Sequence, residues 1–190
     1  MIFINFGFRV ILLPILLIIG VIGQVLSIKI FLSLKTWKAT CKIYYLTIAI
    51  MDLAYLFAFG IPEWTGEGLD FLTSNKIKIN PENLSKVSCR LFRFVWHASW
   101  FISYWTLVAY SVERLIAISN PLLRFRYINY KTAKITCSIL VLIGFTTFLP
   151  IIFSEHLYTL EGEETLPISM RYCYFNNEHF TLITFLCCRF

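Results

Sequence analysis

The sequence predicts an all-α membrane protein, built as an antiparallel bundle of transmembrane helices. Of its 190 residues, 58% are hydrophobic and only 15% are charged. A soluble domain carries about 25% charged residues. The apolar residues also gather into long uncharged runs separated by short charged loops. Because lipid can surround so much apolar surface and water cannot, the composition indicates a membrane protein.

The apolar runs give the order of the elements. Each of the first four holds 19 or 20 residues with at most one charge, and about 20 residues cross a hydrocarbon layer of about 30 Å as a helix. The runs are Val10–Ile28, Ile43–Pro62, Phe94–Val112, Ile135–Ser154 and a shorter one that begins at His179. We therefore expect one partial domain over 1–190, with helices at about 8–34, 40–64, 86–120, 131–152 and 178–190.

Charge in the loops predicts the orientation. The loops at 35–42 and 121–134 hold seven Lys and Arg residues and no acids, whereas the loops at 63–88 and 155–178 hold most of the acids. Cytoplasmic loops are enriched in basic residues, so we expect an extracellular N-terminus at the plasma membrane. The formal net charge of +6 could suit nucleic acid, but the basic residues form no stripe, so no nucleic-acid partner is expected.

Two local patterns lie in the loops expected outside. Asn83-Leu84-Ser85 is an N-glycosylation acceptor, and it falls in the loop that charge places outside. Alternating residues around Cys173, between Arg171 and Phe175, suggest a short hairpin strand.

The region from Cys89 to Pro121 carries a spaced set of residues. Cys89 precedes the third apolar run, and Glu113-Arg114 follows it, with Pro121-Leu122 after that. Cys89 and Arg114 are 25 residues apart, which is about 38 Å along a helix at about 1.5 Å per residue. A continuous helix would place the cysteine at one membrane face and the acid–base pair at the other.

This spacing resembles the third transmembrane helix of rhodopsin-like G protein-coupled receptors. That family has a disulfide cysteine at the outer end, a Glu/Asp-Arg-Tyr motif at the inner end, and a proline-leucine pair in the next loop. The chain departs from the family at three positions. Leu115 replaces the tyrosine, Gln24 after Gly23 replaces an asparagine and is one methylene longer, and Leu140 replaces a tryptophan.

The resemblance implies several site residues. It implies a disulfide between Cys89 and Cys173, the two cysteines expected outside, while the other four cysteines read as small apolar packers. It also implies a sodium ion at Asp52, helped by Ser103, because oxygen ligands suit a hard cation. The alternative is a neutral, protonated Asp52 bonded to its neighbours.

The inner end of the third helix is implied to be a switch. In the family, the arginine is held by the neighbouring acid at rest and meets the G protein on activation. Here these residues are Glu113 and Arg114, with Pro121 and Leu122 in the loop that follows. The alternative is two charges that simply snorkel to the interface.

The outer half of the third helix is implied to line a ligand pocket. Trp96 stands where amine receptors carry an aspartate, so an amine ligand is not expected; a peptide suits the site better, and a lipid comes second. The alternative is packing or lipid contact, and His97 reads as a core or pocket residue and not as a metal ligand. The candidate ligand residues are Glu63, Arg93, Trp96, His97, Trp100, Phe101 and Tyr104.

The sequence predicts a receptor fragment and no enzyme. No Ser/His/Asp set, phosphate-binding glycine loop or paired carboxylates occur, and sodium is the only cofactor considered. Expected partners are membrane lipid, the ligand, a heterotrimeric G protein when the seven-helix fold is complete, and a second receptor. Without helices six and seven the chain should not signal alone. It could instead pair with and modulate full-length receptors, or be a small transporter or channel subunit, although Asp52 is its only deep charge.

Overall fold

The structure is a computed structural model that describes residues 8–33, 39–68, 81–119, 129–159 and 171–175. The chain forms two compact units. The bundle unit comprises Pro14–Ala58 and Val95–Phe148, and the hairpin unit comprises Met1–Leu13, Phe59–Phe94 and Leu149–Phe190.

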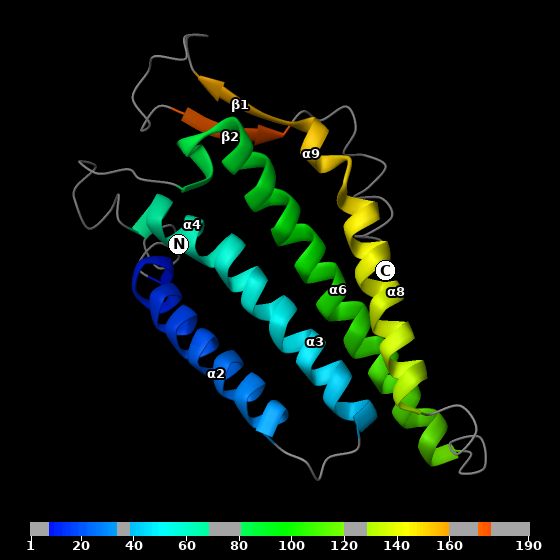
Figure 1. Cartoon of the computed structure of the whole chain (residues 1–190). Coiled ribbons are helices and arrows are strands. Elements are labelled where there is room, and N and C mark those ends of the chain that lie inside the picture. The colour runs from blue at the N-terminus through cyan, green and yellow to red at the C-terminus, as the bar shows by residue number, and fades with distance from the viewer. Residues whose placement is uncertain (1–7, 34–38, 69–80, 120–128, 160–170, 176–190) are drawn as a thin grey trace. The chain divides into compact units, whose positions relative to one another are not determined.

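Four helices in the described residues are long and apolar enough to cross a membrane (Figure 1). This bears out the predicted helical membrane fold. The predicted fifth helix at 178–190 lies outside the described residues. The main helical segments are α2 (Leu13–Ser33), α3 (Ala39–Tyr55), α6 (Lys86–Ser119) and α8 (Tyr130–Phe148).

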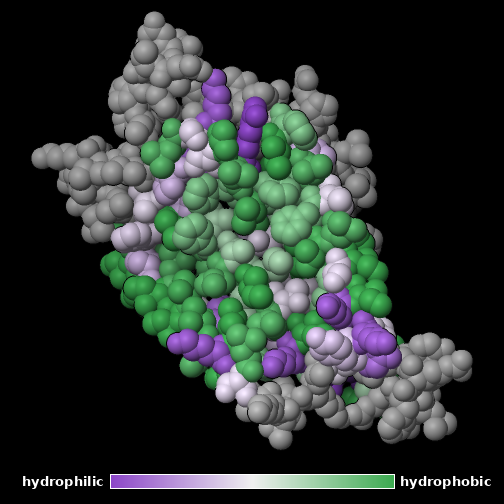
Figure 2. Space-filling model, viewed as in Figure 1, coloured by the Kyte–Doolittle hydropathy of each residue, from purple (hydrophilic) through white to green (hydrophobic). Residues whose placement is uncertain are grey.

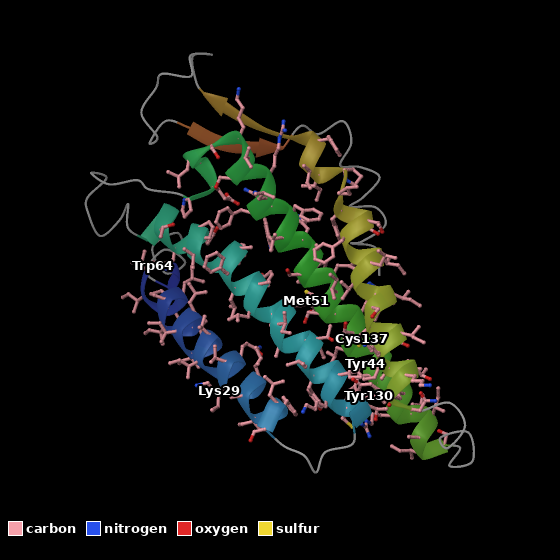
Figure 3. All side chains as sticks on the ribbon, in the orientation of Figure 1. Lys29, Tyr44, Met51, Trp64, Tyr130 and Cys137 are labelled. Atoms are coloured by element: carbon pink, nitrogen blue, oxygen red, sulfur yellow. The ribbon has the colours of Figure 1, made fainter. Side chains whose placement is uncertain are left out.

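The bundle unit is closely packed where small residues let helices approach. A Cβ built on Gly144 of α8 would lie 2.4 Å from Cγ1 of Ile102 on α6, so a glycine is required at this contact. Tyr44 of α3 and Ala133 and Cys137 of α8 form one buried cluster. Tyr44 and Cys137 lie near each other in Figure 3. The large aliphatic side chains of α2 are mostly exposed, as contact with lipid requires.

Figure 2 shows hydrophobic residues over most of the described surface on the side that it presents. Hydrophilic residues on this side gather mainly at helix ends. A protein in water rarely exposes a contiguous apolar surface of this extent, so the surface is that of a protein embedded in lipid.

The second and fourth membrane helices are irregular near prolines. After α3, widened π-type turns at Leu56–Gly60 and Trp64–Gly68 flank the short α4 (Ile61–Glu63), which contains Pro62. The helix expected at 131–152 is interrupted, since α8 ends at Phe148 and α9 (Ile151–Ser154) follows a turn. Pro150 has no backbone N–H to donate to the preceding turn, so the helix cannot continue through it and α8 ends just before it.

The hairpin unit contains the predicted strand around Cys173. β1 (Glu155–Thr159) pairs antiparallel with β2 (Arg171–Phe175), with Leu157 opposite Cys173. A 3₁₀ turn at Pro81–Leu84 leads into α6. The hydroxyl of Ser85 accepts a hydrogen bond from the Ser88 backbone N–H at 3.0 Å, which caps the start of α6.

Candidate functional site

Three membrane helices meet at Asp52 in the bundle unit. The Ser103 hydroxyl of α6 donates to Oδ1 of Asp52 at 2.5 Å, and the Gln24 amide of α2 donates to Oδ2 at 3.0 Å. Each carboxylate oxygen therefore accepts a hydrogen bond from a different helix. Such contacts offset the cost of placing a carboxylate at membrane depth.

The donor groups around Asp52 do not fit a bound sodium ion as they are arranged. A hard cation prefers oxygen atoms that point lone pairs toward it. Here Oδ2 of Asp52 faces an amide N–H of Gln24, whose partial charge repels a cation. Ser103 and Asp52 do lie together, as predicted, but the partner at Oδ2 is a nitrogen. Among the described residues no group of three or more His, Cys, Asp or Glu side chains could hold a metal ion.

Arg114 at the end of α6 rests on uncharged groups. One guanidinium N–H of Arg114 donates to the thiol of Cys41 on α3, and the guanidinium carbon lies 4.7 Å from the centre of the Tyr110 ring. Tyr110 precedes Arg114 by four residues, so both occupy one face of α6. The Nε atom of Arg114 is buried without a hydrogen-bond partner in the described part of the chain.

Glu113 is directed to another partner. The Glu113 carboxylate lies close enough to the Tyr44 hydroxyl of α3 to interact with it electrostatically. Successive residues of a helix point about 100° apart, so Glu113 and Arg114 reach different groups of α3. The predicted resting pair between these two residues is not formed, because no carboxylate in the described chain makes an ion pair with Arg114. Pro121 and Leu122 lie outside the described residues.

The aromatic ligand candidates of α6 divide into two rows in the bundle unit. His97 and Phe101 pack against Phe148 of α8, with ring centroids 5.9 and 5.6 Å apart. Trp100 and Tyr104 pack against each other at 5.3 Å and are 39% and 60% exposed. The second row is therefore the part of the predicted set that is open to a ligand or to lipid. Trp96 lies against His97, with centroids 4.6 Å apart.

The two charged ligand candidates belong to the hairpin unit. Arg93 of α6 forms an ion pair with Glu82, with Nε and Oε1 3.1 Å apart. Glu82 is 8% exposed. Burial raises the pKa of its carboxyl above the usual range, Arg93 opposes this rise, and the charge of Glu63 adds to it. Glu63, Glu82 and Arg93 thus form one electrostatic cluster.

Two further predictions concern this unit. Cys89 is fully buried and is disulfide-bonded, whereas the side chain of its predicted partner, Cys173, lies outside the described residues. Asn83, the predicted glycosylation acceptor, is 5% exposed. A glycan needs an accessible amide, so this burial disfavours a modified Asn83 in the folded chain.

Several residues of these sites had weak or no sequence signals. Glu82 lies in a loop of mixed charge, and nothing local indicates that it is buried. Cys41 was interpreted as an apolar packer, and Tyr44 and Tyr110 carried no signal. Only the helix arrangement brings them to Glu113 and Arg114. Gln24 carried a signal, as the amide beside Gly23, but only the structure shows that it reaches Asp52.

Comparison with known proteins identifies the family. The family model described as "7 transmembrane receptor (rhodopsin family)" matches residues 23–190. The chain therefore belongs to the rhodopsin-like family of seven-transmembrane receptors. It is a multi-pass membrane receptor chain of a family that is not enzymatic.

Relatives in this family include receptors of several kinds. The chain is 23% identical over 138 residues to probable G-protein coupled receptor 34 of Mus musculus, covering 73% of this chain and 34% of that protein. It is 25% identical over 150 residues to somatostatin receptor type 5 of Rattus norvegicus, covering 77% and 39%. It is 26% identical over 125 residues to the B1 bradykinin receptor of Tupaia minor, covering 66% and 33%. The match thus spans between about a third and two fifths of each relative.

Proposed function

We propose that this chain forms the ligand-sensing and transducing part of a receptor that binds an extracellular peptide and couples to a heterotrimeric G protein. One observation carries the proposal. α6 runs unbroken from Lys86 to Ser119, with disulfide-bonded Cys89 near its start and Arg114, held only by uncharged groups, near its end. Somatostatin and bradykinin, after which two of the relatives are named, are peptides.

Each unit by itself holds one set of candidate ligand residues. In the hairpin unit, Glu63 and Arg93 offer both signs of charge. In the bundle unit, Trp100 and Tyr104 offer apolar surface with polar edges. A peptide carries both kinds of complementary group, whereas a lipid needs mainly the aromatic surface. His97 and Phe101 support this surface from behind, by packing on Phe148.

The inner switch would work through α3. At rest, Tyr44 holds Glu113 and Cys41 holds Arg114. Because the thiol and the Tyr110 ring bind a guanidinium less strongly than a carboxylate would, Arg114 can be released toward a G protein. Pro121 and Leu122, in the loop that follows, are proposed to share this coupling surface.

Basal signalling tests the switch when the chain is expressed within a complete seven-helix receptor. Glu113→Gln and Tyr44→Phe should each raise basal nucleotide exchange on the G protein about 3-fold or more, since losing about 1 kcal/mol of a resting contact shifts the equilibrium by about 5-fold. Tyr130→Phe, at an exposed tyrosine of α8, is the matched control. Unchanged basal exchange in both variants would reject the switch.

Surface labelling tests the orientation at the plasma membrane. Ser74→Cys should react with a membrane-impermeant maleimide on intact cells, and Arg126→Cys only after permeabilisation. The native chain gives the background from its own cysteines. If both positions react on the same side, the receptor topology is wrong.

The disulfide is proposed to join Cys89 and Cys173. Closing a loop of about 85 residues would stabilise the fold by about 4–5 kcal/mol in a chain-entropy description. Non-reducing mass spectrometry should recover one peptide pair linked through these cysteines, and two alkylated thiols would refute it. Pairing with a second receptor stays a prediction, whereas the burial of Asn83 and the Gln24 amide at Asp52 argue against a glycan and a sodium ion at those residues.

A further inference from the structure

Both carboxylate oxygens of Asp52 accept a hydrogen bond from a neighbouring helix. Gln24 of α2 and Ser103 of α6 each give one hydrogen bond to a different carboxylate oxygen of Asp52 on α3. The 2.5 Å distance from Ser103 is at the short end for a hydroxyl bound to a charged carboxylate. All three residues belong to the bundle unit, so the contact is internal to one compact body.

The orientation of the Gln24 amide follows from its neighbour. A carboxylate oxygen only accepts hydrogen bonds, so the group that faces Oδ2 at 3.0 Å must be the amide nitrogen and not the amide oxygen. The N–H carries a partial positive charge and supplies Oδ2 with part of the stabilisation that a cation would give. The amide occupies one lone-pair direction of this oxygen, and a cation bound there would lie beside the partial positive charge of the N–H.

Side-chain length explains why Gln24 reaches the carboxylate. Gly20 and Gly23 lie on the same helix, and a Cβ built on Gly23 would meet nothing within 4 Å. Glutamine and asparagine carry the same amide group and differ in length by one methylene. A carbon–carbon bond is about 1.5 Å long. The amide of an asparagine at position 24 would therefore end about 1.5 Å short of the place that Nε2 of Gln24 takes beside Asp52.

We propose that the Gln24 amide takes the place of a monovalent cation at Asp52, so that this receptor chain binds sodium weakly or not at all there. The proposal rests on the family membership only for the identity of the cation that is excluded. Its predicted consequence is specific: shortening Gln24 should create sodium binding that the native chain lacks.

Thermal unfolding of the purified full chain in detergent tests this. Unfolding temperatures are measured in sodium chloride and in choline chloride at equal ionic strength, up to about 0.5 M. The native chain should show no sodium-specific shift. Gln24→Asn should gain one of about 2–4 °C, the size expected for binding by mass action at a site of modest affinity. Gln24→Asn combined with Asp52→Asn should lose it again.

A spectroscopic measurement gives an independent readout. The ²³Na NMR signal should broaden with Gln24→Asn protein and stay sharp with the native chain. Gln24→Met, which keeps the length and removes the amide, serves if the asparagine variant does not fold, and it should also gain broadening.

Two outcomes would overturn the proposal. Equal sodium responses in the native chain and in Gln24→Asn would show that the amide does not compete with the ion. No response in any variant would show that something other than Gln24 keeps the ion away. Neither outcome bears on the coupling switch, whose failure is seen separately in basal nucleotide exchange.

Discussion

Two arginines of α6 show how differently the two units use charge. In the hairpin unit, Arg93 pairs with the buried carboxylate of Glu82 at 3.1 Å. In the bundle unit, Arg114 rests on the thiol of Cys41 and the ring of Tyr110, with no carboxylate partner in the described chain. A charge pair holds its members firmly, whereas uncharged groups hold a guanidinium loosely. The first arginine is therefore suited to fixing a structure and the second to changing partners.

The largest effect is expected where the charge pair is broken. Arg93→Met should lower the free energy of unfolding by about 2–3 kcal/mol, because it takes a partner from a buried carboxylate. Thermal unfolding in detergent measures this. Adding Glu82→Gln should restore part of the loss, since the amide carries no charge. If the loss of unfolding free energy in the double variant equals the sum of the losses in the two single variants, the side chains of Arg93 and Glu82 do not interact.

Close packing is the corresponding support in the bundle unit. Gly144→Ala places a methyl group 2.4 Å from Cγ1 and 2.9 Å from Cδ1 of Ile102. Overpacking of this kind costs about 1–3 kcal/mol. Gly23→Ala is the matched control, because nothing lies within 4 Å of a Cβ there. Equal unfolding temperatures for the two variants would show that α6 and α8 are not packed as described.

Cys41 can convert the loosely held arginine into a firmly held one. Cys41→Asp would give Arg114 a carboxylate partner, so the contact would resemble that of Arg93. We expect Cys41→Asp to be about 1–2 kcal/mol more stable than Cys41→Asn, which has the same shape without the charge. In a complete receptor the aspartate should also lower basal nucleotide exchange. An aspartate variant no more stable than the asparagine variant would mean that Arg114 is not free to pair there.

The sequence predicted the membrane helices well because their signals are local. An uncharged run of about 20 residues has few alternatives to a membrane helix, and the strand around Cys173 follows from alternation over five residues. The interruption of the fourth helix also had a local cause in Pro150, but residue pattern alone did not show that a short helix restarts after it.

The site was harder to predict because its contacts join distant residues. Ser103 and Asp52 were paired by resemblance, and they do meet. The same resemblance paired Glu113 with Arg114, whereas in the structure Arg114 contacts Cys41 of α3 and Glu113 lies by Tyr44 of the same helix. Sequence spacing shows which residues share a helix face, but the neighbouring helix decides which side chain they contact.

The smallest effect expected is a pH dependence that belongs to Glu82. Its pKa in the folded chain is raised, first by burial and then by Glu63, against the opposing effect of Arg93. The folded state therefore holds this proton more firmly than the unfolded state does. Protonated Glu82 therefore stabilises the folded chain. This contribution is fully present below the pKa of about 4.3 that glutamate has in the unfolded chain, and it is lost as the pH rises through the higher pKa of Glu82 in the folded chain.

Glu82→Gln removes the titrating group and isolates this contribution. The unfolding temperature of the native chain, measured relative to that of Glu82→Gln, should fall as the pH rises from about 4 toward 7. Arg93→Met removes the charge that opposes the rise, so in that background the fall should extend to higher pH. A difference that stays flat, or that grows with pH, would mean that the Arg93 ion pair outweighs burial at Glu82. The charge pair would then be the dominant influence on this carboxylate, and the contrast with Arg114 would be sharper than the structure indicates.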